Sequence, residues 1–184
     1  METTKKFFKS VSVLAIALMF GFSANAQQDN KVKTNKLSVN VGEFYSLNLS
    51  DNNATILLDN EAKFASGSES NPITMTIFSS RKYEVSAQVS SAQFSGTAAN
   101  TTVNTDNIDL IVDKTSGNEE AIIANRTNNS LKHAAAEQIA SSLKATKSDV
   151  FRLVYKIPAA NTSAFLDQYG KTISTEITYT LLPL

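Results

Sequence analysis

The sequence contains no cysteine and no tryptophan, and only one histidine and three prolines among its 184 residues. Without cysteine the chain has no disulfide bond, no thiol chemistry and no thiolate metal site. Its fold must therefore depend on a hydrophobic core, and a domain of about 150 residues is long enough to form one. The single histidine, His133, would leave a zinc ion to be bound almost entirely by carboxylates.

The chain also has no excess of positive or negative charge. The chain carries 17 basic and 17 acidic residues, and beyond residue 26 its basic residues form no cluster. Nucleic acids and anionic membrane surfaces bind proteins through concentrated lysine and arginine side chains. The sequence therefore predicts neither a nucleic-acid partner nor an electrostatic membrane anchor.

The longest uncharged apolar run is short, and it lies near the N-terminus. Residues 11–22, VSVLAIALMFGF, follow three lysines, and Ala24 and Ala26 follow the run at A-x-A spacing. Twelve residues fall short of the roughly 20 that a membrane-spanning helix needs, and the three parts together are typical of a secretory signal. We expect residues 1–26 to be a cleavable signal peptide and residues 27–36 to be a flexible polar segment. The mature chain would be exported to the periplasm, the cell surface or the medium, with no membrane span.

Most of the remaining sequence alternates between apolar and polar residues. This two-residue period is typical of strands that bury one face. About eight short strands separated by turn signals predict one all-β domain over residues 37–184, an antiparallel β-sandwich of immunoglobulin-like or pilin-like type. The clearest strands are expected at residues 73–77, 83–89, 108–112, 151–157 and 172–181, with a further short apolar strand at 54–58.

One segment departs from this alternation. Residues 131–145, LKHAAAEQIASSLKA, are rich in helix-forming residues. Four apolar residues recur at every fourth position: Leu131, Ala135, Ile139 and Leu143. This spacing predicts one short helix over the end or edge of the sandwich, and a long loop is the alternative. Residues 161–168 are expected to form a helical turn.

The sequence contains no recognisable catalytic or metal-binding motif. His133 lies beside no motif that would supply a nucleophile and an orienting acid. The acidic clusters at residues 106–109 and 113–120 lack the glycine and glutamate spacing of a calcium loop, so turns and strand ends are expected there. The sequence therefore predicts a protein that is not an enzyme and has no catalytic, cofactor or metal site.

The C-terminal segment carries a family resemblance. Residues 168–181, QYGKTISTEITYTL, join a glycine to a long alternating strand with a late aromatic residue. A segment of this kind, closing an exported β-sandwich, resembles the bacterial pilins of the chaperone–usher and spore coat protein U type. Tyr179-Thr180-Leu181 is also similar to the close of WxL-type surface domains. The chain departs from these families because it has no disulfide and no tryptophan, and because five residues follow Tyr179.

The resemblance implies a role in fimbrial assembly or cell adhesion. A partner's extended segment can complete a sandwich by adding a strand at an open edge. The candidate donor residues are Leu37, Val39 and Val41, which also fit the first strand of their own domain. The candidate C-terminal assembly strand carries Gly170, Ile173, Ile177, Tyr179 and Leu181.

Two functions remain open at this point. The first is a non-enzymatic exported surface subunit, structural or adhesive, that assembles by β-strand exchange with itself or with the help of a periplasmic chaperone. The second is an extracytoplasmic module that binds a glycan or protein ligand, on a host or another surface, through loops at one end of the sandwich.

Overall fold

The computed structural model describes residues 33–184. The predicted signal peptide, residues 1–26, therefore lies outside the described residues, as does most of the predicted flexible segment. Residues 42–184 form one compact unit, and the described residues 33–41 belong to a separate one. The larger unit is mostly β-structure, which confirms the all-β prediction.

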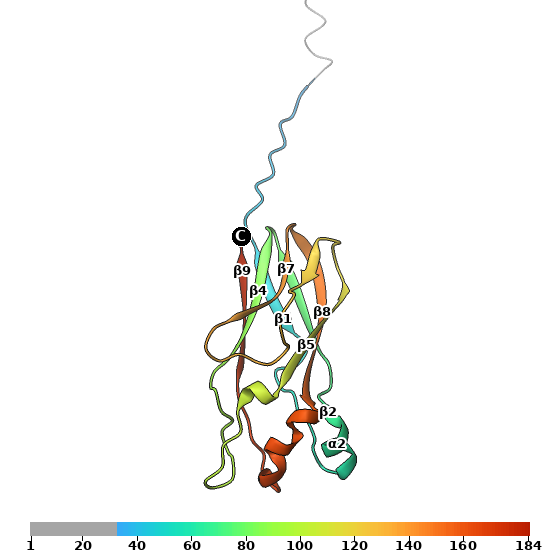
Figure 1. Cartoon of the computed structure of the whole chain (residues 1–184). Coiled ribbons are helices and arrows are strands. Elements are labelled where there is room, and N and C mark those ends of the chain that lie inside the picture. Colours follow the sequence, from blue (N-terminus) through green and yellow to red (C-terminus); the bar gives the residue numbers. More distant parts are fainter. Residues whose placement is uncertain (1–32) are drawn as a thin grey trace, which may run out of the picture. The chain divides into compact units, whose positions relative to one another are not determined.

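Two antiparallel sheets make up the unit (Figure 1). In the first sheet β1 (Tyr45–Leu49) pairs with β3 (Ile73–Ser79), and β3 pairs with the long β8 (Thr146–Pro158). β8 also pairs with β2 (Gly67–Glu69) and with β5 (Asp109–Ser116). In the second sheet the order is β6 (Ala121–Ile123), β7 (Glu137–Ser142), β4 (Tyr83–Val89) and β9 (Ile177–Pro183).

The core lies between the sheets and consists of the side chains that the alternation predicted to point inward. Met75 and Ile77 of β3, Val85 of β4 and Phe151 and Leu153 of β8 have no exposed surface. Burying a side chain of this size contributes about 1.5–3 kcal/mol. The predicted strands at residues 73–77, 83–89 and 151–157 are therefore confirmed. β4 has the predicted bounds, whereas β3 and β8 are longer than predicted.

Within residues 33–184, three short helical segments lie outside the sheets: α2 (Glu61–Ser66), η1 (Thr105–Asn107) and η2 (Ala159–Gln168). The Asn60 side chain caps α2 by accepting a hydrogen bond from the backbone N–H of Lys63 at 3.0 Å. The predicted helical turn at residues 161–168 is confirmed by η2. The strand predicted at residues 54–58 is wrong, although Ile56 and Leu58 pack against the core.

The helix predicted over residues 131–145 is also wrong. This region contains β7, which hydrogen-bonds to β4 on one side and to β6 on the other. Leu131 and Ile139 are buried, whereas Ala135 and Leu143 are exposed, so the four residues do not share one face. Helix propensity amounts to a few tenths of a kcal/mol per residue, and pairing with two neighbouring strands outweighs it.

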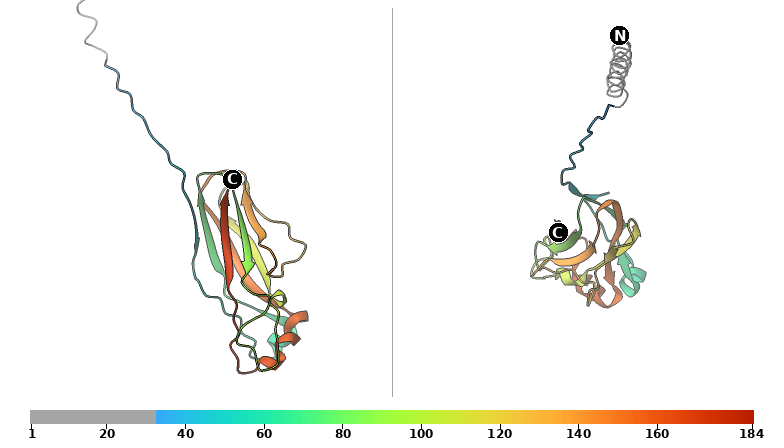
Figure 2. Two further views of the ribbon diagram at one scale, coloured as in Figure 1. Left: turned by 90° about the vertical axis from the view of Figure 1, so that its left-hand side faces the viewer. Right: turned by 90° about the horizontal axis from the view of Figure 1, so that it is seen from above.

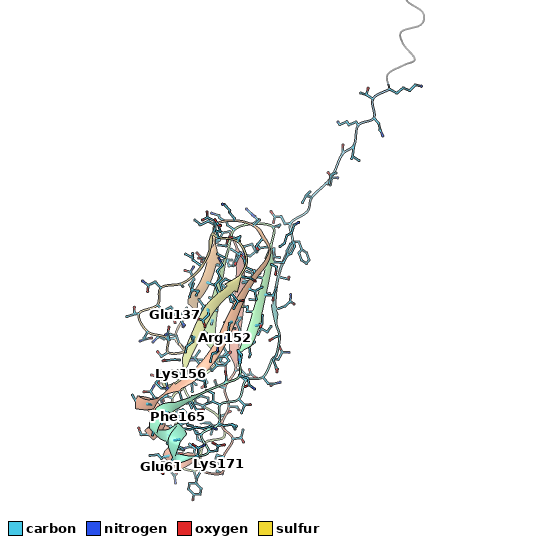
Figure 3. All side chains as sticks on the ribbon, turned by 90° about the vertical axis from the view of Figure 1, so that its right-hand side faces the viewer. Glu61, Glu137, Arg152, Lys156, Phe165 and Lys171 are labelled. Atoms are coloured by element: carbon cyan, nitrogen blue, oxygen red, sulfur yellow. The ribbon has the colours of Figure 1, made fainter. Side chains whose placement is uncertain are left out.

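Both ends of the larger unit lie at the β3–β4 hairpin. The Ser80 N–H donates to the Phe44 carbonyl at 2.9 Å, and the Leu184 N–H donates to the Lys82 carbonyl at 2.8 Å. The strand that begins the unit and the C-terminus therefore meet at one end of the sandwich. Figure 3 shows Phe165, Lys171 and Glu61 at the opposite end.

Candidate functional site

The predicted C-terminal assembly residues lie on and just before β9. Ile177, Tyr179 and Leu181 alternate along the strand and face the core, as predicted, and Ile173 packs against the same core. Gly170 lies earlier, in a turn where the Lys171 N–H donates to the Gln168 carbonyl at 3.0 Å. Its φ of +70° is a conformation that favours glycine.

The three candidate donor residues are all strongly exposed. Leu37, Val39 and Val41 are 86%, 75% and 87% exposed, and residues 33–44 form no strand. The first strand of the larger unit begins later, at Tyr45. Three large apolar side chains at every second position thus remain in water, where their exposure is unfavourable.

β9 is the last strand of its sheet, and half of its backbone groups face away from β4. The Leu184 N–H bonds to Lys82, and the Glu176 carbonyl accepts from the Ser90 N–H. Even-numbered residues of β9 therefore pair with β4, since hydrogen-bonded positions alternate along an antiparallel ladder. The N–H groups of Ile177, Tyr179 and Leu181 point to the other edge, where residues 33–184 place no paired strand. Pro183 has no N–H to offer.

β1 repeats this arrangement in the first sheet. The Phe44 carbonyl accepts from Ser80, and the Ser50 N–H donates to the Thr74 carbonyl at 2.8 Å. Even-numbered positions therefore pair with β3. The backbone groups of Tyr45, Leu47 and Leu49 point to an edge that carries no ladder within the described part of the chain.

β1 and β9 lie beside each other but form no ladder, and we call the space between them the β1–β9 seam. The left view of Figure 2 faces the side on which β9, in red, lies. Tyr45 is 52% exposed although it is paired with the buried Ser79 and shares its inward face. The other inward side chains of the two strands are only partly buried: Leu47, Leu49, Ile177, Tyr179, Leu181 and Pro183.

On the side of the sandwich away from the β1–β9 seam, a loop covers the edge of the first sheet. There the loop between β6 and β7 runs along β5, and the Leu110 N–H donates to the Asn129 carbonyl at 2.7 Å. The Leu131 N–H donates to the Ile108 carbonyl at 2.9 Å, and the Arg126 guanidinium donates to the Leu110 carbonyl. Leu110 and Val112, which face inward on β5, are buried. The core is thus shielded at β5 and left partly open at the β1–β9 seam.

A tyrosine pair lies at the inner side of the seam. The hydroxyls of Tyr179 on β9 and Tyr155 on β8 are 2.7 Å apart. Burial raises the pKa of both phenols, and the neighbouring Tyr155 adds to the rise in the pKa of Tyr179. Both side chains are therefore neutral at physiological pH.

The residues that carry reaction chemistry remain scattered. His133 is exposed on the loop before β7, and its Nδ1 lies 3.4 Å from the Val89 carbonyl oxygen. The acidic clusters form η1, β5 and the turn after β5. Among residues 33–184, no three His, Asp or Glu side chains gather in a way that would hold a metal ion. No helix in this part of the chain is both long and apolar enough to span a bilayer.

The sequence-based prediction of the site was incomplete. Nothing in the sequence placed Tyr45, Leu47 and Leu49 beside β9, because β1 and β9 become neighbours only when the whole chain folds. The chain matches no protein-family model and no curated protein sequence. The resemblance to pilins and WxL-type domains therefore stays a prediction.

Proposed function

We propose that the protein is a non-enzymatic exported surface subunit, structural or adhesive, that assembles by β-strand exchange. Residues 37–41 of one copy add as a strand at the β1–β9 seam of another copy. The observation that carries this proposal is the open seam itself, where two neighbouring edges combine backbone groups outside any ladder with partly exposed inward side chains.

The spacing of the donor residues supports the proposal. Leu37, Val39 and Val41 have the period of a strand that turns one face toward a core. Three N–H groups of β9 that point away from β4 have the same two-residue spacing. They belong to Ile177, Tyr179 and Leu181. Burial of the three donor side chains would contribute about 1.5–3 kcal/mol each, and new ladder hydrogen bonds would add to this.

The test is the oligomeric state of the processed chain, residues 27–184, over a range of concentrations. The protein is unfolded, refolded at high concentration and measured by size-exclusion chromatography with light scattering. We expect dimers and longer ladders. Replacing Leu37, Val39 and Val41 together with serine should leave only monomer, since the inserted strand would lose its apolar face.

The matched control replaces Ser38 and Asn40 with alanine. These residues lie between the donor residues and would point away from the core, so ladders should persist. A processed chain that stays monomeric after refolding at high concentration contradicts the proposal. Ladders that survive the triple serine substitution contradict the choice of donor residues.

A further inference from the structure

A second surface feature lies on the covered side of the sandwich, away from the β1–β9 seam. A hollow of about 470 Å³ opens beside β6 and β7. Its volume falls in the range of pockets that hold small molecules. Its lining includes apolar, charged and polar side chains: Ile122, Ile123, Arg126, Glu137, Gln138 and Ser141. Figure 3 shows Glu137 on the upper part of the unit, far from Phe165 and Lys171.

A β-bulge in β7 shapes the polar wall of this hollow. Val85 pairs with Ala140, but the next residue of β4, Ser86, pairs with Gln138, so Ile139 is an extra residue. Ile139 and Ala140 are both buried. Gln138 and Ser141, three residues apart, consequently both line the hollow.

An apolar side chain lies beside these polar groups. Ile122 is directly opposite Ser141 in the β6–β7 register and is 57% exposed, and its neighbour Ile123 is 40% exposed. Because successive strand residues point to opposite faces, Ile122 shares the outer face with Ser141, whereas Ile123 lies opposite the buried Ala140. The exposed Ile122 side chain therefore places an apolar surface beside an amide and a hydroxyl.

The charges of the hollow cancel. The Arg126 side chain is only 5% exposed, and its Nη1 lies 3.5 Å from Oε2 of Glu137. Its Nη2 also donates to the Leu110 carbonyl and to Oδ1 of Asn129. The one cation and the one anion of the lining neutralise each other, so the lining itself carries no net charge to attract a charged ligand.

We infer that the hollow binds a neutral saccharide. The amide of Gln138 and the hydroxyl of Ser141 each donate and accept hydrogen bonds, which suits the hydroxyl groups of a sugar. The apolar C–H face of a pyranose ring packs on Ile122. With no aromatic side chain in the lining, the expected Kd is weak, on the order of 1 mM.

The test is a titration of the ¹⁵N-labelled processed protein, followed by the amide shifts in two-dimensional NMR spectra. The probes are glucose, galactose, mannose, N-acetylglucosamine and their short oligomers, at up to about 50 mM. At least one should cause saturable shifts confined to residues 121–127 and 137–141. Gln138→Ala and Ile122→Ser should each weaken binding about five- to tenfold, or 1.0–1.4 kcal/mol.

Gln93→Ala is the matched control, because Gln93 is an exposed glutamine outside the hollow, and this variant should bind like the parent. Three outcomes overturn the inference. They are the absence of saturable shifts with every sugar, shifts that gather elsewhere on the sandwich, and tighter binding of glucuronate or glucosamine than of glucose at the same amides. None of these outcomes depends on whether the chain assembles at its seam.

Discussion

Removing the carboxylate of Asp149 should destabilise the protein more than any other single charge removal in the sandwich. Asp149 has no exposed surface. It accepts hydrogen bonds from the Tyr83 hydroxyl at 2.7 Å, the Thr146 hydroxyl at 2.8 Å, and the backbone and side-chain N–H groups of Asn118 at 2.7 and 2.8 Å. The cluster joins β8 to β4 of the other sheet and to the turn that follows β5.

Asp149→Ala leaves these four donors without their acceptor. Losing one partner of a buried charged network costs about 3–5 kcal/mol, a large part of the stability of a typical domain. The control is Asp113→Ala, which breaks an exposed ion pair with Arg152 at 2.9 Å and should cost less than about 1 kcal/mol. Urea unfolding of both variants measures the difference. Equal losses in the two variants would refute the view that Asp149 holds the sheets together.

Two further predictions concern the same core. Gly117→Ala should destabilise the protein by several kcal/mol in urea unfolding, because a Cβ would lie 2.1 Å from Oδ1 of Asp149 at a φ of +122°, whereas Gly42→Ala has open space and should be neutral. The free energy of unfolding should fall as the pH rises past about 10, since burial raises the folded-state pKa of Tyr155 and Tyr179 and the unfolded chain releases these protons first. Urea unfolding midpoints between pH 8 and 11 test this prediction. The Tyr179→Phe variant should lose less stability over this range, and an unchanged loss in that variant contradicts the role given to Tyr179.

The sequence predicted the strands whose inward faces are fully buried. β3 and β4 alternate without interruption, since each inward residue packs in the core. β7 escaped prediction because the extra residue Ile139 breaks its alternation and because the alanines within and just before it favour a helix. The two-residue period is visible only where the ladder is regular.

The sites were harder to predict than the strands. The β1–β9 seam lies between two strands that are far apart in the sequence. The Asp149 cluster likewise joins Asp149 to Tyr83, which is 66 residues away. Similarly, no sequence pattern brings Arg126 beside Glu137. Each contact depends on the order of strands in the sheets, which a one-dimensional pattern does not specify.

The meeting of Phe44 and Leu184 at the β3–β4 hairpin decides where a label can be attached. A fluorescent protein fused after Leu184 would emerge beside the first strand and crowd the edge at which strand exchange between copies is proposed. A short epitope inserted at the 98–100 loop would leave the junction clear, because the Ala98 N–H donates to the Gln168 side chain of η2 at the opposite end of the sandwich. Tagging experiments on this protein should therefore use the loop rather than the C-terminus.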